Sequence, residues 1–155
     1  MKIQARNSIL NYENGLWLIL GAGIYFRFDG LLDRGLIYGD GILYWKAVMT
    51  AVNDNIYTWY YAKPGHHFIL WLFSLIWGWE NYVPVLASLV TGLLSLLLIY
   101  ALGRKMFSHQ IGLSAATLLS ISQWHLHYSR ISGSQIHAIF FWMLALYFYW
   151  QSRPD

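Results

Sequence analysis

The sequence predicts an all-α integral membrane protein, with about four transmembrane helices and one or two interfacial helices in a long first extracytoplasmic loop. Of its 155 residues, 57% are hydrophobic and only 11% are charged, whereas a soluble domain carries about 25% charged residues. The aromatic share is 19%, with 9 Trp and 12 Tyr, and these rings favour the interface between lipid and water. We therefore treat residues 1–155 as a single membrane domain.

Charge and cysteine content narrow the class of function. The formal net charge is only +3, and the chain has no basic helix or base-stacking motif, so we expect no nucleic-acid partner. Cysteine is absent, which excludes a disulfide framework and a thiolate nucleophile.

The first predicted span covers residues 9–28. Its apolar run, residues 16–28, has about 13 residues, whereas a span needs about 20. We therefore expect the helix to begin near Ile9 and to hold Asn11 and Glu13 at the head groups. No small-residue cleavage site follows the run, which favours a retained anchor over a signal peptide.

Residues 29–81 form the predicted extracytoplasmic loop. We expect one interfacial helix over residues 42–53, which a run of Asn and Asp ends. A second is expected over residues 66–79, after Lys63 and Pro64. Its Trp-rich apolar run is short for a comfortable span, although a true span is the competing interpretation.

Three more spans follow. The first has about 20 apolar residues and ends at Gly103, and the second carries Ser and Thr side chains of the kind that favour close helix packing. These spans cover residues 82–102, 108–127 and 135–152.

The basic residues predict the orientation. Arg104 and Lys105 form the one adjacent basic pair between spans, and the positive-inside rule places such a pair in the cytoplasm. The resulting path puts both termini in the cytoplasm and the active face outside a plasma or inner membrane. If residues 66–79 spanned the bilayer, the basic pair would move outside, which is why we prefer the interfacial interpretation.

Four short segments, in this order, resemble the N-terminal part of the GT-C membrane glycosyltransferases. That fold family includes the protein O-mannosyltransferases, the aminoarabinose transferases that modify lipid A, and the oligosaccharyltransferase catalytic subunit. The resemblance covers nearly the whole chain but only the front portion of the longer family members. The segments are Tyr38-Gly-Asp-Gly-Ile-Leu-Tyr44, Tyr61-Ala-Lys-Pro-Gly-His-His67, Ala101-Leu-Gly-Arg-Lys-Met-Phe107 and His127-Tyr-Ser-Arg-Ile-Ser-Gly-Ser-Gln135.

The resemblance implies a reaction. A hexosyl or pentosyl group leaves a polyprenyl-phosphate donor, with inversion, and joins a protein, glycan or lipid acceptor at the extracytoplasmic face. Two alternatives to this reaction stay open. In the first, the chain is a truncated or non-catalytic subunit that binds a lipid carrier or a partner membrane protein. In the second, it is one part of a catalyst that a second chain completes.

Asp40 matches the acidic residue of the family's first loop, which implies a catalytic role. A carboxylate can take a proton from an acceptor hydroxyl, or hold a divalent cation such as Mg or Mn beside phosphate. The alternative is an ordinary turn residue between glycines. Many relatives carry a second acid where this chain has Gly41, which weakens a paired-carboxylate mechanism.

Lys63 and Arg130 are candidate ligands for the lipid phosphate. Lys63 matches the lysine before the family's proline motif, and its ammonium suits phosphate as a point charge. Arg130 follows the Tyr-Ser pair of the family turn and can clamp phosphate through two N–H groups. The alternatives are a snorkelling lysine and a capping or topological arginine.

Three further residues complete the predicted substrate-binding set. His66 can shuttle protons or act as a ligand, or simply be an interfacial polar residue. Gln135 stands close to where relatives often carry an acid, and a neutral amide cannot replace that acid as a base or metal ligand. Arg34 shares the loop with Asp40 and can shape it through Asp33.

Two other groups have open roles. His125 and His127 can share a cation only if the chain there is extended, since on a helix they diverge. An aromatic cluster in the first loop can line a sugar or isoprenoid groove, or form an interface belt. That cluster consists of Trp45, Tyr57, Trp59, Tyr60 and Tyr61.

Overall fold

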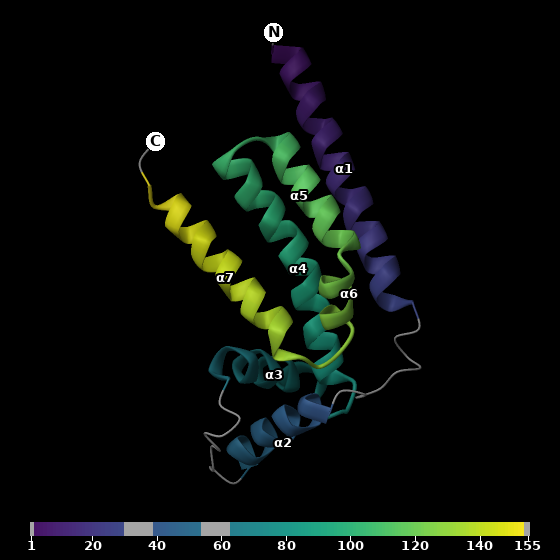
Figure 1. The fold of residues 1–155 in the computed structure, drawn as a ribbon, viewed down its shortest axis with the longest axis vertical. Helices are drawn as coiled ribbons and strands as arrows, with labels where there is room; N and C mark the ends of the chain where they lie inside the picture. The colour runs from purple at the N-terminus through teal and green to yellow at the C-terminus, as the bar shows by residue number, and fades with distance from the viewer. Residues whose placement is uncertain (1, 30–38, 54–62, 154–155) are drawn as a thin grey trace.

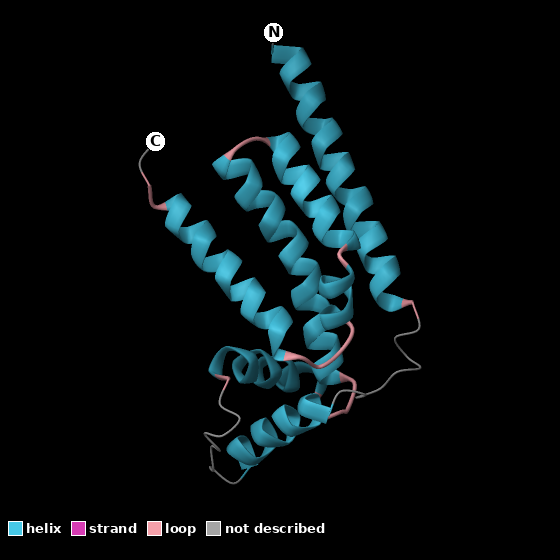
Figure 2. Ribbon diagram, in the orientation of Figure 1, coloured by secondary structure: helices cyan, strands magenta, loops and turns pink. Residues whose placement is uncertain are grey.

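A computed structural model describes residues 2–29, 39–53 and 63–153, and within these ranges all regular structure is α-helical (Figures 1 and 2). The all-α prediction is confirmed for these residues. The helices over residues 2–28, 83–106, 109–121 and 134–151 run side by side along the length of the molecule, and those over residues 39–53 and 64–77 lie across one end of them (Figure 1). The helices are α1 (Lys2–Phe28), α2 (Gly39–Asn53), α3 (Pro64–Trp77), α4 (Val83–Met106), α5 (His109–Ile121), α6 (Gln123–Ser129) and α7 (Ser134–Gln151).

The long helices alternate in direction. Helix α1 runs toward the end occupied by α2 and α3, α4 runs away from it, α5 and α6 return, and α7 runs away again (Figure 1). The start of α1, the turn between α4 and α5 and the end of α7 therefore lie at the end opposite α2 and α3. The predicted path, which puts both termini and the pair Arg104 and Lys105 on one side of the membrane, requires these three parts to lie at one end and stays a prediction.

The structure supplies fewer clear candidates for membrane spans than the four predicted. Among the described helices, α4 alone is long and apolar enough to cross a membrane, with a mean hydropathy of 2.4 over its most apolar stretch. Helices α6 and α7 meet the same conditions together, but they are bent by 113° at their junction. Helix α5 has 13 residues, fewer than a span requires.

The continuous helix expected over residues 108–127 is broken at Ser122. Its φ of −59° and ψ of 117° are not helical, and its N–H bonds the carbonyl of Leu119 at 3.3 Å instead of the carbonyl four residues back. Helix α6 restarts with a bond from the Leu126 N–H to the Ser122 carbonyl at 2.9 Å. The new direction buries His125 and Ser129, which is the packing gain that accompanies the break.

The other helix ends differ less, apart from the start of α1. Helix α1 begins at Lys2 rather than near Ile9, and α4 continues to Met106. The helices predicted over residues 42–53 and 66–79 appear as α2 and α3: α2 starts three residues earlier and ends where expected, and both ends of α3 are shifted by two residues.

A small hydrophobic core attaches α2 and α3 to the start of α4. Its buried members include Trp45, whose ring centroid lies 5.0 Å from that of Trp79. Trp45 is therefore a core residue rather than part of a sugar groove, and the other four members of the predicted aromatic cluster lie outside the described residues. The buried members are Tyr44, Trp45, Val48, Leu70, Val83 and Ala87.

Two glycines allow α4 and α5 to pack closely. A Cβ at Gly112 would lie 2.6 Å from the carbonyl oxygen of Tyr100 and 2.9 Å from the backbone nitrogen of Arg104. A Cβ at Gly103 would lie 2.7 Å from the Cα of Gly112. Because these neighbours are backbone atoms, they cannot move aside without separating the helices.

We expect Gly112→Ala to lower the free energy of unfolding by about 1–3 kcal/mol, since overpacking forces the backbone to shift. The matched control is Gly21→Ala in α1, where a Cβ would meet nothing within 4 Å. The control should be neutral or slightly stabilising, because Ala favours a helix interior by about 1 kcal/mol over Gly. Thermal unfolding of the purified protein in detergent measures both, and equal melting temperatures for the two variants would contradict the close packing.

Candidate functional site

The site lies where α2 and α3 meet the turn between α6 and α7. The first turn of α2 touches that turn directly, because a Cβ at Gly41 would lie 2.8 Å from both the carbonyl oxygen and the Cβ of Ser132. Asp40 precedes Gly41 and is exposed. The glycine that stands in place of a second acid thus permits the close approach that brings the backbone of Asp40 beside Ser132.

Lys63 connects three helices at this place. Its Nζ donates a hydrogen bond of 2.9 Å to the hydroxyl of Ser134, the first residue of α7, and another to the phenol oxygen of Tyr44 on α2. The ammonium also lies 4.5 Å from the centre of the Tyr44 ring, a cation–π contact. Lys63 is the N-cap residue of α3, and Pro64 follows at the first helical position, where its missing N–H costs nothing.

Asp40 and Lys63 are therefore both placed against one short segment. Gly41, next to Asp40, contacts Ser132, and Lys63 bonds Ser134. The predicted catalytic acid and the predicted phosphate ligand are thus both placed beside the turn before α7, which lies about 70 or more positions later in the chain.

His66 lies buried next to Lys63. Its Nδ1 is 2.9 Å from the Nδ1 of His137 on α7, and one of the two rings must supply the proton. The Tyr44 ring meets His66 edge to face with centroids 5.0 Å apart. Burial lowers the pKa of His66 to about 2, and the nearby His137, His67 and Lys63 act in the same direction. His66 is thus neutral near pH 7, so it can relay a proton but cannot pair ionically with phosphate.

The remaining predicted ligands face other neighbours. Arg130 donates from Nη2 to the backbone oxygen of Asp29, which joins the end of α6 to the end of α1. This contact matches the capping alternative. Gln135 lies in the first turn of α7, and a Cβ at Gly133 would lie 2.7 Å from its Oε1. Arg34 lies outside the described residues.

A buried arginine that the sequence analysis passed over lies at the end of α1. Arg27 has no exposed surface; its Nη1 donates to the carbonyl oxygen of Gly23 at 2.9 Å, and its Nη2 bonds the Nδ1 of His125 at 2.7 Å. Because guanidinium only donates, Nδ1 of His125 accepts and its proton sits on Nε2. An ionisable residue inside an apolar run marks a functional or structural site by default, and that signal was present in the sequence.

The remaining histidines do not form a metal centre. His125 is occupied by Arg27, while His127 lies exposed on α6. Over residues 2–29, 39–53 and 63–153, no three His, Cys, Asp or Glu side chains are grouped so that they could hold a metal ion.

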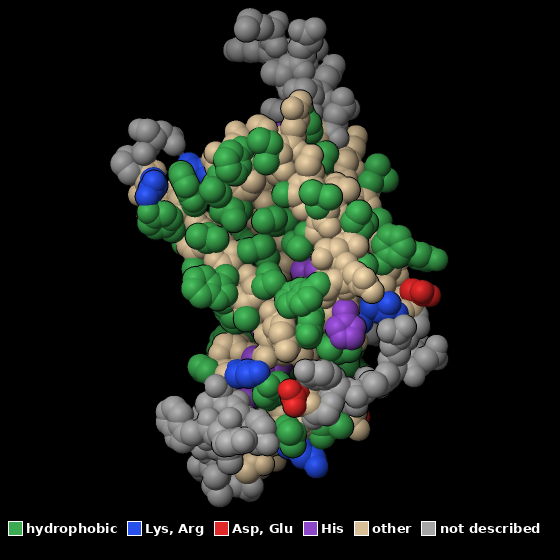
Figure 3. Space-filling model, in the orientation of Figure 1, with side chains coloured by type: hydrophobic (Ala, Val, Ile, Leu, Met, Phe, Trp, Pro, Cys, Tyr) green, Lys and Arg blue, Asp and Glu red, His purple; other side chains and the backbone are tan. Residues whose placement is uncertain are grey.

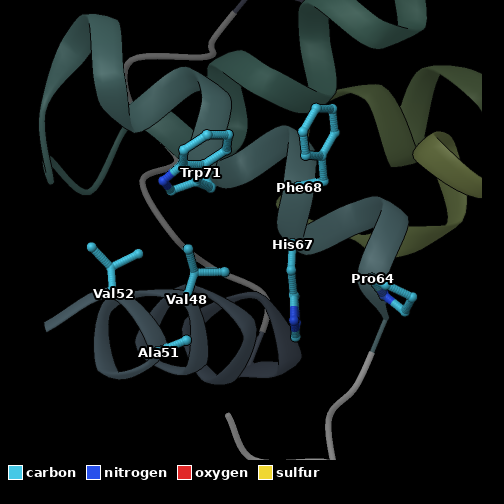
Figure 4. Close-up of a pocket in the computed structure, with 7 residues that line it drawn as sticks. All are labelled: Val48, Ala51, Val52, Pro64, His67, Phe68 and Trp71. Atoms are coloured by element: carbon cyan, nitrogen blue, oxygen red, sulfur yellow. The ribbon is translucent and has the colours of Figure 1, made fainter. Parts of the chain in front are cut away.

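An open apolar groove of about 330 Å³ runs between α2 and α3 beside this site. Val48 and Val52 on α2 face Trp71 on α3, and His67 points from α3 toward α2 (Figure 4). Pro64 lines one end of the groove, so the groove begins next to Lys63. The pKa of His67 is lowered by burial and by Lys63.

A sequence profile described as dolichyl-phosphate-mannose-protein mannosyltransferase matches residues 62–152. The chain belongs to this family. The match covers more than half of the chain and includes Lys63, His66, Arg130 and Gln135, while Asp40 lies before it. Neither a curated protein nor a solved structure matches the chain.

This mannosyltransferase family is a GT-C family of membrane-embedded enzymes that use sugars carried on a lipid phosphate. The predicted resemblance to GT-C glycosyltransferases is therefore confirmed at the level of the family. The match spans α3 to α7, which are the helices that carry Lys63 and the turn before α7.

Arg27 and His125 should be energetically coupled. Replacing His125 with Ala leaves a buried guanidinium without its acceptor, so the loss of stability should be larger in the wild type than in an Arg27→Leu background. We expect a coupling free energy of about 1.5–3 kcal/mol, the range for hydrogen bonds to charged groups. A double-mutant cycle on thermal or denaturant unfolding measures it, and additive losses would contradict the pair.

Acid should weaken the fold through His66. The unfolded ring, with an ordinary pKa of 6.5, takes up a proton that the folded ring refuses until about pH 2. The free energy of unfolding should therefore fall as the pH drops below about 6.5, by at most about 1.4 kcal/mol per unit.

The slope of the free energy of unfolding against pH, measured between pH 7 and pH 4, tests this effect. His66→Gln should show a shallower slope than the wild type, whereas His127→Gln, which removes an exposed histidine outside the cluster, should keep it. An unchanged slope in His66→Gln would show that this ring does not govern the acid sensitivity.

Proposed function

We propose that the chain takes part in transferring a mannose-like sugar from a polyprenyl-phosphate donor to an acceptor at the extracytoplasmic membrane face. The observation that carries the proposal is the position of Lys63: a lysine within the family match bonds Tyr44 and Ser134 beside the first turn of α2. The site combines a cation, an exposed acid and an apolar groove, which suit a phosphate, an acceptor hydroxyl and an isoprenoid chain.

The membrane arrangement we propose has four spans: α1, α4, α5 with α6, and α7. The alternating directions of these helices support it, as does the position of Arg104 and Lys105 at the end opposite the site. Hydrophobic side chains spread over the middle of the face seen in Figure 3, and the charged ones lie at its edges and in its lower part. Trp17, Leu18 and Trp142 are at least 70% exposed, as expected for side chains that contact lipid.

Lys63 would bind the carrier phosphate. An ammonium has three N–H groups, and Tyr44 and Ser134 engage two of them, which leaves one for a phosphate oxygen. Positive charge at the edge of a low-dielectric region stabilises the phosphate as it leaves the sugar. Arg130 and Gln135 would position the turn between α6 and α7 rather than contact the phosphate.

The groove between α2 and α3 would hold the first isoprene units of the donor. Its lining is almost wholly apolar and it starts at Pro64, adjacent to the ammonium. A chain in this groove would place its phosphate beside Lys63 and the sugar beside the exposed Asp40.

Asp40 would act as the general base. Its carboxylate takes the proton of the acceptor hydroxyl, the hydroxyl oxygen bonds the sugar's anomeric carbon from the face opposite the phosphate, and the bond from that carbon to the phosphate oxygen breaks. Polyprenyl phosphate leaves with the electron pair, and the anomeric configuration inverts. Among the described residues, no three His, Cys, Asp or Glu side chains are grouped to hold a metal ion, and the step above is written for the residues of the chain alone.

Transfer from a radiolabelled polyprenyl-phosphate mannose to a hydroxyl acceptor, in membranes containing this chain, tests the proposal. We expect Asp40→Asn and Lys63→Gln each to lower the rate at least 100-fold, the size typical of a lost general base or electrostatic contact. The matched controls are Glu80→Gln and Lys46→Gln, which remove an exposed acid and an exposed cation near the same end of the bundle; both should retain activity.

The outcome separates the proposal from its alternatives. Donor binding without transfer, at high protein concentration, would indicate a non-catalytic lipid-binding subunit. Transfer that appears only when a second multispanning protein co-purifies would indicate a catalyst built from two chains. Equal rates for wild type and Asp40→Asn would remove Asp40 from the mechanism.

A further inference from the structure

The end of the bundle opposite the candidate site carries a second cavity. It lies between the turn that joins α4 to α5 and the end of α7, and its volume is about 630 Å³. We call it the basic pocket. Its polar lining consists of Arg104, Lys105, Ser108, His109, Tyr147 and Gln151.

The charge of the basic pocket suits an anion. Arg104 and Lys105 are adjacent and exposed, and none of the described residues that line the pocket is a carboxylate. Arg offers a planar fork of N–H groups and Lys a compact point charge, the two donors that proteins use most for phosphate. Tyr147 and Gln151 add neutral hydrogen-bonding groups from α7 on the other side.

The wall of the basic pocket is held in place by hydrogen bonds. The N–H groups of Phe107 and Ser108 both bond the carbonyl of Gly103, at 3.0 and 3.2 Å, and the Ser108 hydroxyl accepts from the N–H of Ile111 at 3.3 Å. His109 is fixed by a 3.1 Å hydrogen bond between its Nδ1 and the Tyr100 hydroxyl. The two basic side chains therefore project from a hairpin that is already ordered.

The non-polar part of the lining indicates which anion fits. Ala101 and Phe107 also line the pocket, and Phe107 is 65% exposed. A soluble phosphate gains nothing from apolar contacts of this kind, whereas a lipid can pack its acyl chains along the apolar surface and place its phosphate at the rim. Basic pockets between transmembrane helices at the cytoplasmic face bind lipid head groups in this way.

We propose that the basic pocket binds the phosphate of an anionic membrane lipid, such as a phosphatidylglycerol, with Arg104 and Lys105 as its ligands. This site is separate from the sugar-transfer site, and it rests only on the membrane arrangement proposed above. Phosphate-ester chemistry is shared with soluble phosphate compounds, and the binding experiment below distinguishes the two sources.

Native mass spectrometry of the purified chain in detergent tests the proposal, with dioctanoyl phosphatidylglycerol and dioctanoyl phosphatidylcholine as the two lipids. We expect at least a 10-fold preference for phosphatidylglycerol. The double variant Arg104→Gln with Lys105→Gln should lower its affinity about 10- to 30-fold, since each basic residue near an anionic lipid contributes about five-fold.

The matched control is Arg153→Gln. It removes a cation from the same end of the molecule but from outside the pocket lining, where Arg153 stacks on Tyr149 and Trp150. The control should bind phosphatidylglycerol as the wild type does. The single variant Lys105→Gln should lose about five-fold and keeps the test decisive if the double variant unfolds.

Three results would overturn the proposal: no preference between the two lipids, wild-type affinity in both basic-pocket variants, or an equal loss in Arg153→Gln. Competition with glycerol phosphate assigns the source. Suppose that glycerol phosphate displaces the lipid at a concentration no higher than the one at which the lipid binds. The ligand is then a soluble phosphate compound, and the lipid assignment is wrong.

Discussion

The bonds of Lys63 to Tyr44 and Ser134 are the interaction on which the arrangement of the site depends. Helices α2 and α3 lie across the end of the bundle, and these bonds tie both of them to the start of α7. The contact of His66 with His137 joins α3 to α7 a second time. Among the described residues, both hydrogen-bond partners of the Lys63 ammonium are neutral oxygens. Neither of them offsets its positive charge, which favours an anionic ligand.

At the end of α1, too, a basic side chain is held by neutral groups. Arg27 is fully buried and bonds a histidine and a backbone carbonyl rather than a carboxylate. This pairing explains the break at Ser122, because a continuous α5 would carry His125 along its original path, whereas the redirected α6 buries it against Arg27. Gly92 on α4 leaves room for α6, since a Cβ at Gly92 would clash with Ser129 of that helix. The break and the buried arginine are therefore two parts of one packing arrangement.

Much of the fold could be predicted from sequence because its signals are local. The long apolar run of α4, the Pro64 that starts α3 and the polar turns set most helix ends within a few residues. The break at Ser122 could not be predicted, since it depends on Arg27, nearly 100 positions away in the chain. Placing Asp40 and Lys63 on one turn likewise required the fold, because the close approach of Gly41 to Ser132 leaves no local pattern. The motif predicts Arg130 as a phosphate ligand, whereas its contact with the backbone oxygen of Asp29 leaves no signal in the sequence.

Direct binding of a short polyprenyl phosphate that carries no sugar tests the central claim, that Lys63 holds the phosphate of the lipid carrier. Wild type, Lys63→Met and Lys46→Met would be compared with the matching polyprenol, which lacks the phosphate. The account predicts that Lys63→Met loses at least 10-fold in affinity for the phosphate form alone, and that Lys46→Met binds as the wild type does. Equal affinity of wild type and Lys63→Met for the polyprenyl phosphate would contradict it.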